Sequence, residues 1–143
     1  MGANVPKQFL EINGKAIIIH TLEKFKEALP SAELLLVLPE AEVQRWKEIS
    51  KATDFENISI ALGGATRFES VKSGLSLIKA EGVVGVHDAV RPFVSLKTIQ
   101  NTFAEAEKSG AAIPVVELKD SIREIGIATS KAVERSSYRI VQT

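Results

Sequence analysis

Strand-like and helix-like runs alternate along most of the chain, and this alternation restricts the folds that the sequence can adopt. Short apolar runs that predict buried strands occur at residues 34–38, 58–62, 83–86 and 111–116. Helical stripes begin after Gly14, at Pro39, near Thr66 and after Ser95. Such an alternation is typical of a parallel sheet covered by helices. We therefore predict a three-layer α/β fold with a mostly parallel sheet.

Apolar stripes and end signals define the predicted helices. The stripes are Ile18, Leu22, Phe25 and Leu29; Val43, Trp46 and Ile49; Phe68, Val71, Leu75 and Ile78; and Leu96, Ile99 and Phe103. Thr66 and Glu69 have the spacing of a capping box, which places the start of the third helix near Thr66. Ser95 is a suitable N-cap for the last helix, and Gly110 is a suitable end.

The pattern changes after Asp120. Residues 121–142 have no helical stripe and are rich in β-branched residues. We predict that they form an extended arm or hairpin that packs elsewhere, with a second subunit as one possible surface. The remainder is interpreted as one domain, so that the chain is a single domain over residues 1–143 with an arm at its end.

The composition limits the kinds of function. The chain has 143 residues, with 45% apolar and 25% charged residues, as in an ordinary soluble domain. Its 18 basic and 18 acidic residues balance, so charge predicts no binding to nucleic acid or to an anionic membrane. The lack of cysteine excludes disulfides, thiolate nucleophiles and thiolate metal sites. Any cation would need oxygen ligands, and the expected compartment is the cytoplasm.

The segment at residues 86–93 is the most informative motif. The apolar run before it is predicted to be a strand that ends at Asp88 and Arg91, because Pro92 cannot donate to a strand ladder. In open α/β sheets, ligands bind beyond the carboxyl ends of the strands. An acid and a guanidinium at this place suit an anionic ligand that carries a divalent cation. The alternative is a salt-bridged turn without a ligand.

Three further segments could contribute to the same edge. Gly63-Gly64 joins a predicted strand to a predicted helix, an arrangement that suits anion binding but is also common in plain turns. Ser70 lies one helical turn after Thr66 and could face the same cleft. Lys7 follows a proline, and Ser121 follows the last predicted buried strand; each is also compatible with an ordinary surface position.

Taken together, the segments resemble a known family. The ordered blocks Pro-Lys-Gln-Phe, Gly-Gly-Ala-Thr-Arg-Phe-Glu-Ser-Val, Val-His-Asp-Ala-Val-Arg-Pro-Phe and Lys-Asp-Ser-Ile resemble the methylerythritol phosphate cytidylyltransferases of isoprenoid biosynthesis. The resemblance implies a Rossmann-like fold of the nucleotide-diphospho-sugar transferase type. It also implies a homodimeric enzyme that transfers CMP from CTP to a sugar-alcohol phosphate with Mg²⁺.

The resemblance assigns roles to individual positions. Lys7 matches a lysine at the α-phosphate that stabilises the transition state. The nucleotide positions are Gly63, Gly64, Ala65, Ser70 and Asp88, with Asp88 also near the magnesium ion. The substrate positions are Asp88, Arg91, Ser121, Arg135 and Thr143, and Arg135 is expected to reach the neighbouring subunit.

The chain also differs from the family pattern. The family's first strand, with its Ala-Ala-Gly-x-Gly-x-Arg-Met loop, would precede Met1, and its last helices would follow Thr143. We therefore expect a fragment of a longer protein that could be inactive by itself. The alternatives are a ribitol-5-phosphate cytidylyltransferase and a nucleotide-binding domain without catalysis.

Overall fold

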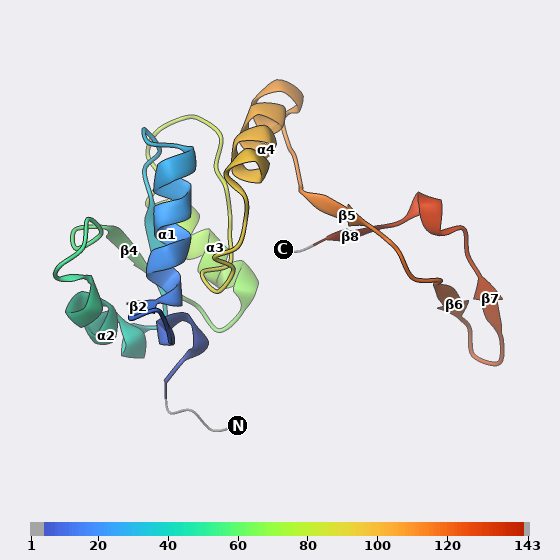
Figure 1. The fold of residues 1–143 in the computed structure, drawn as a ribbon, viewed down its shortest axis with the longest axis horizontal. Helices are drawn as coiled ribbons and strands as arrows, with labels where there is room; N and C mark the ends of the chain where they lie inside the picture. The colour runs from blue at the N-terminus through green and yellow to red at the C-terminus, as the bar shows by residue number, and fades with distance from the viewer. Residues whose placement is uncertain (1–4, 142–143) are drawn as a thin grey trace. The chain divides into compact units, whose positions relative to one another are not determined.

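The computed structural model describes residues 5–141, and the chain divides into two compact units, Met1–Gln100 and Asn101–Thr143 (Figure 1). The first unit contains η1 (Lys7–Phe9), β1 (Glu11–Ile12), β2 (Lys15–Ala16), α1 (Ile17–Ala28), β3 (Leu35–Leu38), α2 (Glu40–Ser50), β4 (Ser59–Leu62) and α3 (Arg67–Ser76). Helix α4 (Leu96–Ser109) begins in this unit and continues into the second. The second unit contains β5 (Val115–Glu117), β6 (Arg123–Ile125), β7 (Ser130–Ala132), η2 (Arg135–Ser137) and β8 (Arg139–Val141).

Strands β3 and β4 form a parallel pair at the centre of the first unit. Leu36 lies opposite Ile60, and Leu38 lies opposite Leu62. The Gly63 amide donates to the Leu38 carbonyl at 2.9 Å, which extends the ladder by one bond beyond β4. The strands predicted at residues 34–38 and 58–62 are therefore confirmed.

Helices α1 and α2 share one face of this pair. Leu36 and Leu38 of β3 belong to one buried cluster with Ile18 of α1 and Trp46 of α2. Trp46 has no exposed surface, which confirms its predicted place in the core. The buried members of the cluster are Phe9, Ala16, Ile18, Ile19, Leu22, Leu36, Leu38, Trp46 and Phe55.

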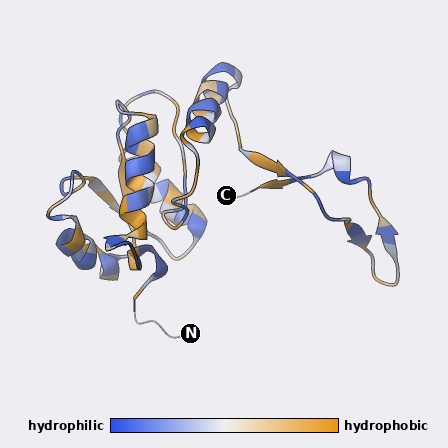
Figure 2. Ribbon diagram, in the orientation of Figure 1, coloured by the Kyte–Doolittle hydropathy of each residue, from blue (hydrophilic) through white to orange (hydrophobic). Residues whose placement is uncertain are grey.

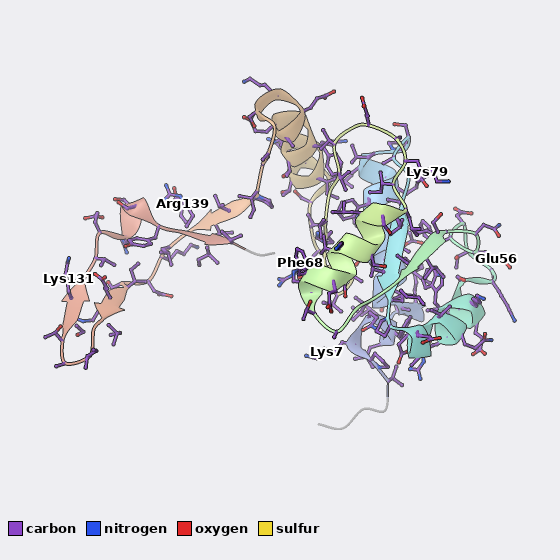
Figure 3. The ribbon with its side chains drawn as sticks, turned by 180° about the vertical axis from the view of Figure 1, so that it is seen from behind. Lys7, Glu56, Phe68, Lys79, Lys131 and Arg139 are labelled. Carbon is purple, nitrogen blue, oxygen red and sulfur yellow. The ribbon has the colours of Figure 1, made fainter. Side chains whose placement is uncertain are left out.

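Helix α3 covers the opposite face. A Cβ atom built on Gly74 would lie 2.8 Å from Cγ2 of Val37, so only glycine allows the helix to come this close to β3. Val37 points away from Leu36 and Leu38, because successive side chains of a strand alternate between its two faces. The sheet thus lies between α1 and α3, as the front and rear views show, and the predicted three-layer arrangement is confirmed (Figures 1 and 3).

The prediction of a buried strand at residues 83–86 is wrong. Val83, Val84 and Val86 are exposed, and no strand is formed there in the described chain. A strand exists only when a neighbour accepts and donates its backbone hydrogen bonds, and none of the described strands lies beside this segment. The apolar stripe of α3 is also largely exposed, with 74% of Phe68 accessible, and Ile78 lies beyond the helix end.

Helix α4 has the predicted ends. The Thr98 amide donates to the Ser95 hydroxyl at 3.0 Å, and Gly110 has a φ of +88° just after the last helical residue. Its first turn belongs to the first unit, where Ile99 is buried and the Gln100 side-chain amide donates to the Ala28 carbonyl. No helix within residues 5–141 combines the length and apolarity that a membrane crossing demands.

The second unit consists mainly of antiparallel pairs. β5 pairs with β8, and β6 pairs with β7 as a hairpin, so the prediction of extended structure after residue 120 is confirmed. The prediction of a buried strand at residues 111–116 is wrong in two respects. β5 begins only at Val115, and both Val115 and Val116 are exposed, although the strand is apolar (Figure 2).

Candidate functional site

The glycine turn, residues 63–66, connects β4 to α3. The Gly64 amide donates to the Ser70 hydroxyl at 3.1 Å, and that hydroxyl donates to the Thr66 carbonyl at 3.0 Å. Ser70 therefore joins both ends of the turn from the first part of α3. The structure brings Gly63, Gly64, Ala65 and Ser70 together as the sequence predicted, with the Ser70 hydroxyl facing the turn.

A capping box fixes the start of α3. The Glu69 amide donates to Thr66 Oγ1 at 3.2 Å, and the Thr66 amide donates to Glu69 Oε2 at 3.0 Å, which confirms the predicted cap. A Cβ atom on Gly64 would lie 2.4 Å from the Glu69 Cβ, so the turn needs a glycine here. The amides at a helix start carry partial positive charge, which favours a bound anion.

The acidic turn, residues 87–91, places one carboxylate between two guanidinium groups. Arg67 Nη1 donates to Asp88 Oδ1 at 2.9 Å, and Arg91 Nε donates to Asp88 Oδ2 at 2.8 Å. The Asp88 side chain is only 22% exposed, whereas that of Arg67 is 57% exposed. The pair Asp88–Arg91 was expected from the sequence, but Arg67 was not given a role.

The two arginines keep Asp88 ionised. The hydrogen bond from Arg91 is the main cause that lowers the pKa of Asp88 below its usual range, burial opposes this shift, and the hydrogen bond from Arg67 adds to it. A carboxylate held in this way accepts hydrogen bonds or binds a cation at neutral pH. It does not act there as a proton donor.

Helix α1 holds the backbone of the acidic turn. The buried Thr21 hydroxyl donates to the Ala89 carbonyl at 2.8 Å, and Ala89 packs against the core cluster. The His87 ring lies 4.8 Å from the Phe25 ring, and its Nε2 lies 3.1 Å from the Arg91 carbonyl. His87 thus has a structural position, between the Phe25 ring and the Arg91 carbonyl.

Lys7 lies on η1. Its neighbour Phe9 is buried in the core cluster, with the Arg45 guanidinium 5.8 Å from the Phe9 ring centre, so the backbone of η1 is anchored. The Lys7 side chain is exposed, and within residues 5–141 it has no ion-pair partner (Figure 3). An anchored backbone with an unpaired ammonium group suits a lysine that meets an anionic ligand. The predicted contact of Lys7 with a phosphate stays a prediction.

The second unit contains the other predicted positions. Arg135 Nη1 donates to the Lys119 carbonyl at 2.8 Å, which brings Arg135 to the segment that carries Ser121. Ser121 is exposed just before β6. Thr143 lies outside the described residues.

The described residues offer few metal ligands. Residues 5–141 contain no cluster of three or more His, Cys, Asp or Glu side chains that could hold an ion. Asp88 is the acid that the sequence predicted as a ligand, and both of its oxygens accept bonds from arginines. These residues fit a magnesium ion only if most of its ligands come from phosphate oxygens and water, which is the usual arrangement for this ion.

Comparison with known proteins identifies the family. The sequence profile described as "IspD: 2-C-methyl-D-erythritol 4-phosphate cytidylyltransferase" matches residues 1–143. The chain belongs to this family. Curated cytidylyltransferases with this description share 44% identity over 145 residues in Bacteroides thetaiotaomicron and 43% over 144 residues in Bacteroides fragilis. Each alignment covers 100% of this chain and 66% of the relative.

A solved structure confirms the fold of the family. The crystal structure of 4-diphosphocytidyl-2C-methyl-D-erythritol synthase from Anaerococcus prevotii is similar with a TM-score of 0.85 and 26% identity. The similarity covers 99% of this chain and 63% of that one. The chain therefore spans about two thirds of the length of the cytidylyltransferases that it matches.

Proposed function

We propose that the protein transfers CMP from CTP to 2-C-methyl-D-erythritol 4-phosphate, with release of pyrophosphate, in isoprenoid precursor biosynthesis. The observation that carries the proposal is the family match, which extends over all residues of the chain. The geometry of the glycine turn and the acidic turn supports it, because these turns contain two sequence blocks that are specific for the family when they occur together.

The proposed reaction depends on positioning and charge. A phosphate oxygen of the sugar-alcohol phosphate attacks the α-phosphorus of CTP, and the bond from that phosphorus to the bridging oxygen of pyrophosphate breaks. The glycine turn and Ser70 hold the cytosine base, Asp88 and Arg91 orient the ribose and the second substrate, and Lys7 balances the negative charge that grows on the α-phosphate. No covalent enzyme intermediate is needed.

A magnesium ion belongs to the proposal. Asp88 would supply one carboxylate oxygen, and the triphosphate would supply the other charged ligands. When bound, the ion neutralises charge on the phosphate oxygens.

We further propose a cytoplasmic homodimer in which residues after Ser121 complete the site of the partner. Arg135 would reach the sugar-alcohol phosphate in the partner's site, and Ser121 and Thr143 would be further positions that bind this substrate. Mixing full-length Arg135→Ala protein with Asp88→Ala protein should restore activity through hybrid dimers. A mixture no more active than the single variants would contradict sharing between subunits.

The test of the proposed function is turnover by the full-length protein. Pyrophosphate release should require both CTP and the methylerythritol phosphate, and UTP should be rejected because it lacks the exocyclic amine that the backbone of the glycine turn would read. Equal rates with CTP and UTP would contradict the nucleotide assignment. Preference for ribitol 5-phosphate would change the substrate, and binding of CTP without turnover would favour a non-catalytic domain.

A further inference from the structure

The acidic turn is held on its two sides by different parts of the fold. On the side of α1, the hydroxyl of Thr21 and the ring of Phe25 hold its backbone and His87. On the side of α3, Arg67 donates a hydrogen bond to the carboxylate of Asp88. Arg67 thus ties the acidic turn to α3, in addition to the contacts from α1, and it is separated from Asp88 by 21 positions in the sequence.

The backbone that carries Arg67 is fixed, so its contact with Asp88 has a defined geometry. It is the first residue of α3, directly after the capping residue Thr66. The capping box and the Ser70 hydroxyl fix the backbone on both sides of Arg67. The contact therefore links the glycine turn to the acidic turn, and it does so through one charged hydrogen bond of 2.9 Å.

We infer that Arg67 is a positioning residue. It holds the Asp88 carboxylate at a fixed position relative to the glycine turn. The other side-chain bond to the Asp88 carboxylate comes from Arg91 of the same turn, so loss of Arg67 would remove the bond that joins this carboxylate to α3. The inference rests on the proposed function for its kinetic consequence. The structural claim, that Arg67 holds the Asp88 carboxylate, concerns the protein without bound ligands.

A double-mutant cycle in the full-length protein tests the inference. Arg67→Gln should lower kcat by roughly 10- to 100-fold while KM for CTP stays nearly constant, since misplaced reacting groups cost rate and leave nucleotide contacts intact. In the Asp88→Asn protein, the same substitution should have almost no further effect. Lys72→Gln removes a charge from the exposed side of the same helix and should leave turnover unchanged.

Three kinetic outcomes would overturn the inference. Equal losses from Arg67→Gln in the wild-type and Asp88→Asn proteins would mean that Arg67 acts on a ligand directly. A loss confined to KM for CTP would make it a nucleotide-binding residue, and an equal loss in Lys72→Gln would indicate a general charge effect.

Amide hydrogen exchange separates this inference from the proposed function. Arg67→Gln should accelerate exchange in residues 86–92, where the Arg91 amide donates to the Asp88 carbonyl at 3.1 Å, and should leave β3 and β4 unchanged. The Lys72→Gln protein should show the same exchange rates in residues 86–92 as the wild type. Unchanged exchange in residues 86–92 would overturn the positioning role even if the enzyme turns over. Absence of turnover in the wild type would instead contradict the proposed function alone.

Discussion

The hydroxyl of Thr21 donates a hydrogen bond of 2.8 Å to the carbonyl of Ala89, 68 residues further along the chain. Thr21 Oγ1 also lies 3.2 Å from the Ile17 carbonyl of its own helix. A hydroxyl has one hydrogen to donate, and the shorter distance favours the bond to Ala89. This bond connects the core helix α1 to the turn that carries Asp88 and Arg91.

Replacing Thr21 with valine should therefore disturb the acidic turn. Thr21→Val keeps the shape of the side chain but leaves the Ala89 carbonyl without its donor, which should reduce the free energy of unfolding by about 1–3 kcal/mol. It should also lower kcat/KM. Thr21→Ser keeps the hydroxyl and should retain most activity. Urea unfolding and steady-state kinetics check both, and equal behaviour of the two variants would mean that the hydroxyl is unimportant.

Gly64→Ala should be more harmful than Gly63→Ala. The new methyl at position 64 would meet the Glu69 Cβ at 2.4 Å, whereas the nearest atom to one at position 63 is the Ser70 hydroxyl at 3.3 Å. We expect Gly64→Ala to lose about 1–3 kcal/mol of stability through this overlap and to raise KM for CTP. Thermal unfolding and CTP titration measure the difference. Equal effects of the two substitutions would contradict the packing argument.

Lys7→Ala should lower kcat and leave KM for CTP nearly unchanged. If Lys7 stabilises charge that grows only in the transition state, its loss should cost roughly 10²–10³ in rate. Lys47→Ala on α2 removes another exposed ammonium group and is the matched control. Steady-state pyrophosphate release distinguishes the two. A Lys7→Ala protein with normal kcat would remove this residue from the mechanism.

The ion pairs of Asp88 should contribute stability only while its carboxylate is charged. Because the arginines lower the pKa of Asp88 in the folded state, the contribution is fully present above the unfolded-state pKa of about 3.9 and is lost as the pH falls through the folded-state pKa. Asp88→Asn should therefore be less stable than the wild type at pH 7, and the difference should shrink in acid. Urea unfolding between pH 3 and pH 7 measures this, with exposed Asp54→Asn as the control. A difference that stays constant in acid would contradict the ion-pair interpretation.

Local sequence signals predicted the elements that depend on neighbouring residues. The capping pair Thr66–Glu69 and the periodicity around Trp46 gave the start of α3 and the buried face of α2 because caps and stripes act within a few residues. The Gly63-Gly64 turn was located for the same reason. These signals were sufficient for the α/β class and for two of the segments of the candidate site.

Features that depend on distant partners were not predictable in the same way. The run at residues 83–86 has the composition of a buried strand, but pairing and burial require neighbours that the run itself does not encode. The contacts Arg67–Asp88 and Thr21–Ala89 join residues far apart in the sequence. The signal for Arg67 was its place directly after the capping residue Thr66 and three positions after Gly64, which does not identify Asp88 as its partner.

Because glycine has no side chain, Gly74 lets helix α3 pack closely against β3, and the orientation of the helix depends on this contact. Gly74 rests against Val37 about two helical turns from Thr66, so a group inserted at this contact should tilt the helix and move its far end. That end carries the amides of the glycine turn and the guanidinium of Arg67. A mutation or a small molecule that separates α3 from β3 at this contact would thus change the geometry of the candidate site from a distance, without entering it.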